Sequence, residues 1–448
     1  MVRPPVCVSL ARGCISAFLV LTLLSAALLS AGPAKAPAEP PESVVVIADV
    51  HGDFDDFIAI LGRTGLIDKQ NHWTGGKKTF VQVGDLLDRG PKPREVMDLM
   101  MALEKEAVQA GGRVVSLLGN HEIMNVMGDL RYVNPVSYAS FADANSKERQ
   151  RAAYGEYLKW RSSHAPLLAE LPQPLELTEA EWMARHPAGF IEQREAFGPK
   201  GKYGQWLRGH SAVAQIEGTI FLHGGIHPGL ANTQLDAVNN RIHDEIKEFD
   251  VSKQYLQNEK VILPFFDLPE INSVLQAEVK AELKSRVPAN AERQAKMQAF
   301  VRHGDWFSVR DDGPLWFRGY DRWSEEEGAL QVSKVLDAYK AAHLVVGHTV
   351  QVGGYIRPRF GNKVFLIDTG MLSSYYPGGR ASALAICGDA KFTAVYLDQQ
   401  IVLLDSASSS RGGGSGEHRV LENGATVAEK VAASPPDGIC SATTAAPQ

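Results

Sequence analysis

Val44-Val-Val-Ile-Ala-Asp49-Val-His51-Gly52-Asp53 combines a β-branched apolar run of strand length with an abrupt polar end. Runs of this length and composition are typical of buried strands in α/β proteins. Asp49 and His51 stand two residues apart where the strand stops, at the edge of a sheet where α/β proteins usually bind their ligands. A carboxylate and an imidazole together suit a divalent transition metal. The segment therefore predicts a sheet with a metal site at its carboxyl edge.

Four later segments repeat this pattern, because each is an apolar run that ends in metal-ligand residue types. They are Thr79-Phe-Val-Gln-Val-Gly84-Asp85-Leu-Leu-Asp88-Arg89-Gly90, Arg113-Val-Val-Ser-Leu-Leu-Gly119-Asn120-His121-Glu122, Thr219-Ile-Phe-Leu-His223-Gly224-Gly225 and His343-Leu-Val-Val-Gly347-His348-Thr349. One such run is a weak signal, but chance rarely places five in one chain. The set predicts that one site collects ligands from the ends of several strands.

In this order, the motifs resemble those of the calcineurin-like metallophosphoesterases, specifically the phosphoprotein phosphatase branch. Three further segments make the chain most similar to the bacterial Shewanella-like protein phosphatases: Gly-Pro-Leu-Trp-Phe-Arg318-Gly, Gly347-His-Thr-Val-Gln351 and Ile367-Asp-Thr-Gly-Met371. The resemblance covers roughly residues 43 to 400. It implies an α/β fold in which two sheets form a metallophosphoesterase sandwich flanked by helices. One departure is Ala48, which stands where the family usually has glycine and affects the expected loop shape rather than metal binding.

The resemblance also implies a centre of two divalent metal ions. The implied ligands are Asp49, His51, Asp85, Asn120, His223 and His348. Asp85 would bridge the ions, with the first two residues on one metal and the last three on the other. A lone histidine after an apolar run could equally be a core residue, but the glycines beside His223 and His348 favour the ligand role. Imidazole and carboxylate ligands without a thiolate favour manganese, with iron or zinc as alternatives.

His121 has a different role by the same resemblance. It would be the general acid that protonates the leaving alkoxide or phenolate, while Asp88 orients its ring and raises its pKa. A metal-bound hydroxide would be the nucleophile, because a metal pair lowers the pKa of bound water. Glu122 is expected to hold the loop by hydrogen bonds rather than to act on substrate.

Three arginines are candidates for binding the phosphoryl group. Arg89 has a planar charged group that matches two phosphate oxygens, and its alternative is a structural salt bridge with Asp88 or another acid. Arg318 is the second candidate, with a surface arginine after an aromatic strand as the alternative. Arg208 is a third candidate.

Length, composition and charge describe an ordinary globular protein. The chain has 448 residues, of which 44% are hydrophobic and 22% charged, and its formal net charge is −6. This composition supplies ample material for a core. Nucleic acid is not an expected partner, because no broad basic field is available to bind a phosphate backbone.

The N-terminal segment has the pattern of an export signal. Arg3 and Arg12 precede an apolar stretch, residues 15–31, that leads to the cleavage-like Ala34-Lys35-Ala36. Residues 1–36 are therefore predicted to be a signal peptide, with an uncleaved membrane anchor as the alternative. Residues 37–42 would be a linker. The mature protein is expected to be periplasmic or secreted, and to contact the membrane only if the segment is uncleaved.

The remaining chain is predicted to be one catalytic domain, residues 43–405, followed by a disordered tail, residues 406–448. Helical patterns follow the first two site motifs, as in βαβ units. Helical insertions at about 140–210 and 236–302 interrupt the domain. They are expected to form a cap that walls the crevice, with surface helices that play no part in substrate selection as the alternative.

Apolar alternation after His348 predicts strands at 364–368, 382–386 and 392–397, which we assign to a second sheet. Cys387 and Cys440 would remain after signal cleavage. They could form a disulfide or stay free, and the sequence does not decide between the two.

Three functions are compatible with these observations. The first is a metal-dependent phosphomonoester hydrolase that acts as a protein phosphatase, for which the resemblance implies phosphotyrosine preference. The second is an exported phosphatase or diphosphatase for nucleotides or other small phosphoesters. The third is a binding protein that retains the metals without turnover, which the intact Asp88, Arg89 and His121 disfavour.

Overall fold

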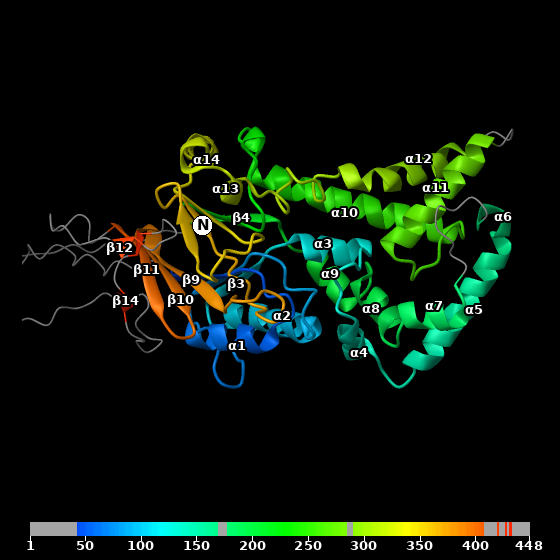
Figure 1. Ribbon diagram of the computed structural model, residues 1–448, viewed down its shortest axis with the longest axis horizontal. Coiled ribbons are helices and arrows are strands. Elements are labelled where there is room, and N and C mark those ends of the chain that lie inside the picture. The colour runs from blue at the N-terminus through cyan, green and yellow to red at the C-terminus, as the bar shows by residue number, and fades with distance from the viewer. Residues whose placement is uncertain are drawn as a thin grey trace, which may run out of the picture. The chain divides into compact units, whose positions relative to one another are not determined.

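The computed structural model describes residues 43–168, 177–284 and 290–406, together with three two-residue strands between 419 and 431. Two β-sheets and the helices around them make up this part of the chain (Figure 1). The predicted signal peptide, residues 1–36, the predicted linker, residues 37–42, and most of the predicted tail lie outside the described residues. None of the described helices is both long and apolar enough to span a membrane.

The larger sheet has seven strands in the order β14-β11-β10-β9-β1-β2-β3. Their bounds are β1 Ser43–Ile47, β2 Thr79–Gln82, β3 Arg113–Ser116, β9 Ser382–Cys387, β10 Lys391–Tyr396, β11 Gln400–Asp405 and β14 Lys430–Val431. The first three strands run parallel, and the remaining four continue the sheet antiparallel from β1. The carboxyl ends of β1, β2 and β3 therefore meet at one edge.

The smaller sheet has five strands in the order β4-β5-β6-β8-β7. Their bounds are β4 Val213–Ile216, β5 Thr219–Leu222, β6 His343–Val346, β7 Arg357–Arg359 and β8 Val364–Leu366. β5, β6 and β8 are parallel, and an antiparallel strand closes each side. This sheet thus brings the ends of β5 and β6 together, as the larger sheet does for β1 and β2.

The two sheets share one apolar core, which confirms the predicted sandwich. Val46 of β1, Val345 of β6 and Leu384 of β9 belong to one buried cluster. Phe365 of β8 and Phe392 of β10 stack across it with their ring centroids 4.5 Å apart. Because successive strand residues point to opposite faces, the neighbours of Val46 point outward instead.

Helices cover the outward faces of both sheets. The helices are α1 Phe54–Arg63, α2 Pro93–Gln109, α3 Asn120–Met127, α4 Tyr138–Phe141, α5 Ser146–Ser163, α6 Ala165–Leu168, α7 Glu179–Arg185, α8 Phe190–Phe197, α9 Lys202–Arg208, α10 Leu235–Asn258, α11 Leu268–Lys284, α12 Ala291–Val301, α13 Gly319–Arg322 and α14 Glu325–Tyr339. Val45 and Ile47 pack in one cluster with Phe57 of α1 and Met97 of α2. Burial on both faces explains why β1 is continuously apolar rather than alternating.

The assignment of residues 382–386 and 392–397 to a second sheet is wrong. These segments form β9 and β10, but β9 pairs with β1 and extends the first sheet, and only β8 joins the second. Alternating hydrophobicity identifies a strand with one protected face, and it carries no information about which neighbour the strand pairs with.

The inserted helices lie in the ranges in which the sequence predicts helical insertions, and they pack on one another as well as on α3 (Figure 1). Trp160 of α5 donates a hydrogen bond to the carbonyl of Val261, and its ring meets Phe266 edge-on at 5.0 Å. Trp182 of α7 stacks on His186 at 4.2 Å. These aromatic contacts make the insertions a cohesive helical layer rather than separate surface helices.

The tail and the cysteines add two details. β14 pairs with β11, and β12 (Arg419–Val420) pairs with β13 (Thr426–Val427). The prediction of a disordered tail at residues 406–448 did not include these short strands. Cys387 is disulfide-bonded. Cys440 lies outside the described residues.

A buried acid at the start of α11 provides a test of this helical layer. Glu270 and Asp267 each accept a hydrogen bond from the other's backbone N–H, and burial, together with the charge of Asp267, raises the pKa of Glu270 to about 8. In the folded chain this carboxyl therefore holds its proton above the unfolded value of 4.5. Its contribution to stability is complete at low pH and is lost as the pH rises toward 8.

We expect Glu270→Gln to remove this part of the pH dependence, because glutamine keeps the acceptor oxygen without a titrating group. At pH near 8 the variant should unfold at a temperature higher by roughly 2 °C or more, as measured by circular dichroism across about pH 5 to 8. Glu259→Gln, at an exposed position, should behave as the wild type. Parallel pH profiles for wild type and Glu270→Gln would contradict the assignment.

Candidate active site

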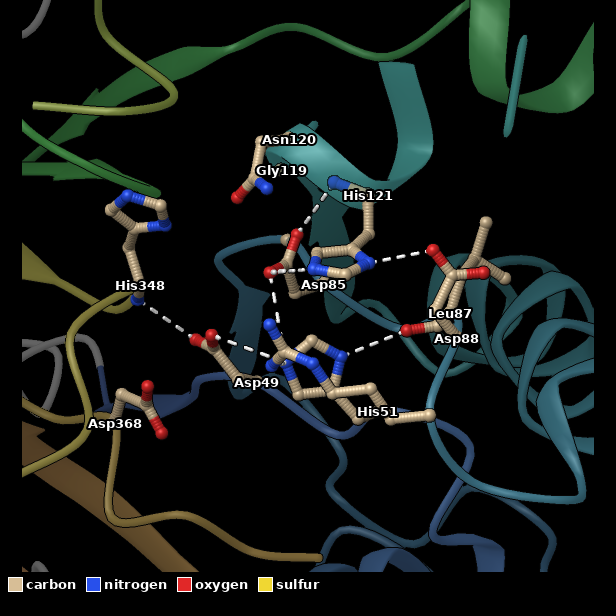
Figure 2. Close-up of polar contacts among 12 residues, drawn as sticks. Asp49, His51, Asp85, Leu87, Asp88, Gly119, Asn120, His121, His348 and Asp368 are labelled. Atoms are coloured by element: carbon tan, nitrogen blue, oxygen red, sulfur yellow. Dashed lines mark hydrogen bonds and ion pairs between the residues drawn. The ribbon is translucent and has the colours of Figure 1, made fainter. Parts of the chain in front are cut away.

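The predicted ligands gather where the parallel strands of both sheets end, as Figure 2 shows for all of them except His223. The six side chains are Asp49 and His51 after β1, Asp85 after β2, Asn120 at the start of α3, His223 after β5 and His348 after β6. All six are buried. A site formed from five separate chain segments is the arrangement that the strand-end motifs predict.

The site loops have an unusual backbone. Five non-glycine residues in them have positive φ: His51 at 49°, Asp85 at 58°, Asp88 at 68°, Arg89 at 62° and His348 at 67°. Positive φ is uncommon for residues other than glycine, and such conformations cluster at functional sites, where the surrounding structure enforces them.

The glycines beside the ligands have a steric reason. A Cβ atom on Gly119 would lie 2.3 Å from Oδ1 of Asp85, and one on Gly347 would lie 2.5 Å from Oδ1 of Asp49. Both contacts are too short for any side chain, so the two loops can approach the carboxylates only with glycine at these positions.

Two groups of side chains have the geometry to hold a metal ion, and Asp85 belongs to both. One group is His51, Asp85 and His121, and the other is Asp85, His223 and His348, with the ligand atoms of each group within 4.8 Å of one another. Asp85 thus occupies the shared position expected of a bridging ligand. The first group contains His121, whereas the sequence predicts Asp49 as the ligand beside His51 and Asp85.

Asp49 nevertheless lies between the two groups. Its Oδ2 is 3.7 Å from Nε2 of His51, and its Oδ1 accepts a hydrogen bond of 3.0 Å from the backbone N–H of His348. Asn120 is equally close to the second group, since its Oδ1 lies 2.8 Å from Nε2 of His223. All six predicted ligands are therefore in one cluster.

The hydrogen bonds of three imidazoles fix which nitrogen can bind a metal. His51 Nδ1 lies 2.8 Å from the carbonyl of Leu87, and His223 Nδ1 lies 3.0 Å from that of Val83. His348 Nε2 lies 3.2 Å from the carbonyl of Trp316. Carbonyl oxygens only accept, so each of these nitrogens carries a proton, and the other nitrogen of the ring faces the cluster, where it can bind a metal once it is deprotonated. Such outer hydrogen bonds are typical of metal-binding histidines.

Two of these cluster-facing nitrogens lie close together. His348 Nδ1 and His223 Nε2 are 3.1 Å apart, and Nε2 of His223 is also 3.3 Å from Oδ2 of Asp85. Burial alone would lower the pKa of His223, but the charges of Asp85 and Asp49 outweigh it and raise the pKa to about 9. The site therefore calls for positive charge between these atoms, and the donor set fits a divalent cation there.

His121 is held by a carboxylate, as predicted. Its Nδ1 lies 2.6 Å from Oδ2 of Asp88, and its backbone N–H donates to Oδ1 of Asp85. Burial opposes protonation, but Asp85 and the hydrogen bond from the ring to Asp88 raise the pKa of His121 above its ordinary value. Asn125 donates to the other oxygen of Asp88 at 2.8 Å. Asn125 has no distinguishing pattern within α3, so its role is not visible in the sequence.

Glu122 holds the loops together, also as predicted. Its two carboxylate oxygens accept hydrogen bonds from the backbone N–H groups of Gly119, Asp85 and Leu86, at 2.8 to 2.9 Å. This side chain ties the loop after β2 to the start of α3, so it fixes Asp85 relative to Asn120 and His121.

Two of the three candidate arginines lie at the site. Arg89 contacts Nε2 of His51 and donates to the hydroxyl of Tyr376. Its guanidinium lies 5.6 Å and 5.2 Å from the ring centres of Tyr132 and Tyr375. These tyrosines were not anticipated, because they lie far from Arg89 in the sequence.

Arg318 and Arg208 have different surroundings. Arg318 donates to the carbonyl of His348 at 3.0 Å and to the hydroxyl of Thr349, so it lies beside the second group. Arg208 instead forms a two-point ion pair with Asp250 of α10, at 2.7 and 2.8 Å. The prediction that Arg208 could bind phosphate at this site is therefore wrong.

Asp368 is a further site residue to which the sequence analysis gave no role. It follows β8, and Figure 2 shows it next to Asp49. Burial and the charge of Asp49 raise the pKa of Asp368 well above its ordinary value. Among the described residues its Oδ2 is buried without a hydrogen-bond partner. The sequence did contain a signal for this role, because Asp368 closely follows β8, which runs parallel to β6.

Comparisons with known proteins agree with this geometry. The Shewanella-like protein phosphatase 2 of Arabidopsis thaliana is 31% identical over 218 residues, which cover 47% of this chain and 53% of the relative. The Shewanella-like protein phosphatase 1 of Plasmodium berghei is 25% identical over 334 residues, covering 73% and 67%. The cold-active protein-tyrosine phosphatase of a Shewanella species superposes with a TM-score of 0.51 over 81% of this chain and 80% of that chain, at 23% identity, which shows a shared fold.

The family assignment comes from a broader match. The model of the calcineurin-like phosphoesterases matches residues 43–352, which include all six predicted ligands and Arg318. This range is well over half of the chain. The chain therefore belongs to the calcineurin-like phosphoesterase family.

Proposed function

We propose that this phosphoesterase is a metal-dependent protein phosphatase that uses two divalent ions, with manganese favoured over iron or zinc. One observation carries the proposal: Asp85 is shared by two buried groups of potential metal ligands, and His121, held by Asp88, stands directly beside it. The two relatives named Shewanella-like protein phosphatases support the choice of a protein substrate.

Different residues of the chain would bind the phosphoryl group and protonate the leaving group during phosphoester hydrolysis. When bound, the metal pair would supply a water of low pKa as nucleophile and would neutralise charge on the phosphoryl group. Arg89 and Arg318 lie on different sides of the ligand cluster, where each can bind phosphoryl oxygens. His121 then donates its proton to the oxygen of the leaving group, and the carboxylate of Asp88 stabilises the charged ring before that transfer.

The surroundings of Arg89 favour an aromatic leaving group. Tyr132 and Tyr375 flank its guanidinium and are 39% and 50% exposed, so their rings are open to a ligand. A phenyl ring attached to the bound phosphate could stack on them, and such contacts contribute about 0.5–1.5 kcal/mol. We therefore propose phosphotyrosine as the preferred substrate residue and the inserted helices as the wall that selects it.

The same rings give a specific reason to keep the second candidate function, a nucleotide phosphatase or diphosphatase. A nucleobase stacks on tyrosine as readily as a phenyl ring does. The proposed export of the protein, from the pattern of residues 1–36, also agrees with scavenging of extracellular phosphoesters.

A substrate panel separates these two functions. Protein beginning at Pro40 would be loaded with manganese, and kcat/KM would be measured for phosphotyrosine and phosphoserine peptides and for nucleoside mono- and diphosphates. We expect the phosphotyrosine peptide to be preferred by about 2- to 12-fold over phosphoserine, the value of one aromatic contact. Nucleotides as the best substrates would replace the protein-phosphatase proposal with the second function.

Tyr375→Leu tests the stacking in the same assay. Its kcat/KM should fall for phosphotyrosine peptide but not for glycerol phosphate, which has no ring. Tyr355→Leu serves as the control, because Tyr355 is also exposed but its ring contacts Tyr396 rather than Arg89. Equal losses on both substrates would mean that Tyr375 supports the fold of the loop rather than the substrate.

A further inference from the structure

The helical layer contains a cavity that the proposed chemistry does not use. It has a volume of about 380 Å³ and lies among α3, α5, α8 and α10. None of the predicted metal ligands or catalytic residues lines it. Its volume is in the range of small-molecule sites, so it could hold a compact ligand.

Cations and anions both line this cavity, but they are not all available to a ligand. Arg208 is engaged with Asp250, and Arg149 with Glu192 at 2.7 Å. The two other lining acids, Glu156 and Glu195, are exposed to solvent. Two cations, Arg194 and Lys253, remain without an ion pair among the described residues.

Arg194 is buried and only partly satisfied. It is 7% exposed, and its Nη1 donates to the backbone carbonyl of Asn125 at the end of α3. Its Nε is buried with no acceptor among the described residues. Burial lowers the pKa of Arg194 to about 10, so the group remains charged at neutral pH. A buried charged donor without an acceptor is unfavourable unless a ligand supplies one.

Lys253 brings a second positive charge to the same space. It is half-buried on α10, and burial together with the charge of Arg194 lowers its pKa to about 7. The positive charges of Arg194 and Arg208 both act on it, which shows that the three cations are close together. The charges of Asp250 and Asp267 also act on Lys253, and that of Asp267 acts on Arg194, but of these three cations only Arg208 forms an ion pair among the described residues.

We propose that this cavity is a binding site for a phosphate group, held by Arg194 and Lys253. A dianion matches two cations that line the same cavity, and a planar guanidinium suits the oxygens of a phosphate group. The volume leaves room for a small organic body, so the group can belong to free phosphate or to a phosphorylated small molecule. The site does not depend on the proposed catalytic function.

Equilibrium dialysis with radiolabelled inorganic phosphate tests the site on the manganese-loaded protein. We expect two phosphates per wild-type chain, one at the metal centre and one in the cavity. Lys253→Met should raise the Kd of one of them at least ~10-fold, the effect of losing a charged hydrogen bond. Lys253 is suited to this test because it has no described partner to lose, whereas Arg194 also supports α3.

Matched variants make the result decisive. Lys247→Met, an exposed position on the same helix, should keep both phosphates. Arg89→Ala with Arg318→Ala should lose the other phosphate and keep the one in the cavity. A single phosphate per wild-type chain, or two unchanged phosphates in Lys253→Met, would overturn the proposal.

A competition experiment identifies the source of the phosphate group. Benzylphosphonate presents the same oxyanion on an organic body that phosphatases cannot hydrolyse. Displacement of the cavity-bound label from Arg89→Ala/Arg318→Ala protein would assign the site to phosphorylated small molecules. Retention of the label would assign it to free phosphate.

Discussion

Replacing Asp85 by asparagine is expected to abolish activity by removing the bridge between the two metal positions. Oδ2 of Asp85 lies 3.3 Å from Nε2 of His223 and 3.7 Å from Nε2 of His51, so one oxygen faces both groups. Asparagine has the same shape but no negative charge and one acceptor oxygen fewer. We expect bound manganese to fall from two ions per chain to one or none, and kcat/KM on an aryl phosphate to fall at least ~10³-fold.

Elemental analysis of the purified protein and initial-rate kinetics would measure both effects. Asp55→Asn is the matched control, because Asp55 lies near the site in sequence but is exposed and pairs with Lys92. It should keep two ions and full activity. An Asp85→Asn variant that retains two ions and wild-type turnover would exclude Asp85 as the bridge.

His121→Asn is expected to separate general-acid catalysis from metal binding. Loss of a general acid lowers kcat by about 10² to 10⁴. The loss should be greatest for alkyl phosphates, whose leaving groups need a proton, and smaller for nitrophenyl phosphate, whose leaving group is stable as an anion. Bound manganese should stay at two ions per chain, because the proposal places His121 outside the ligand set.

Metal content is the deciding measurement, since His121 also has the geometry to join the first ligand group. Manganese reduced to one ion per chain would make His121 a ligand and leave the general acid to be found elsewhere. His164→Asn, at a histidine of the helical layer, should change neither metal content nor the dependence on leaving group.

The strand-end motifs made the ligand cluster predictable because each ligand is fixed by its own local sequence. A parallel strand brings its carboxyl end to the common edge, so an acid or histidine placed directly after it must join the site. Arg208 shows where this reasoning fails. It lies on a helix, where nothing in the local sequence tells whether its partner is a substrate or Asp250, 42 residues away.

The same limit applies to Asn125 and Tyr376. Their roles depend on contacts with Asp88 and Arg89, at separations of 37 and 287 residues. The sheet assignment of β9 and β10 failed for a related reason, because strand pairing is decided by the packed faces of the whole domain and not by one strand's alternation.

Asn125 also connects the proton donor to helices that lie far from the metal ligands in the sequence. Its side chain receives a hydrogen bond from Gln193 and gives one to Asp88, while its carbonyl receives one from Arg194. The orientation of the proton donor thus depends on α8, some 70 residues later in the chain. Shortening or exchanging the inserted helices, as in a chimaera with a relative, would therefore weaken turnover even if every metal ligand stayed in place.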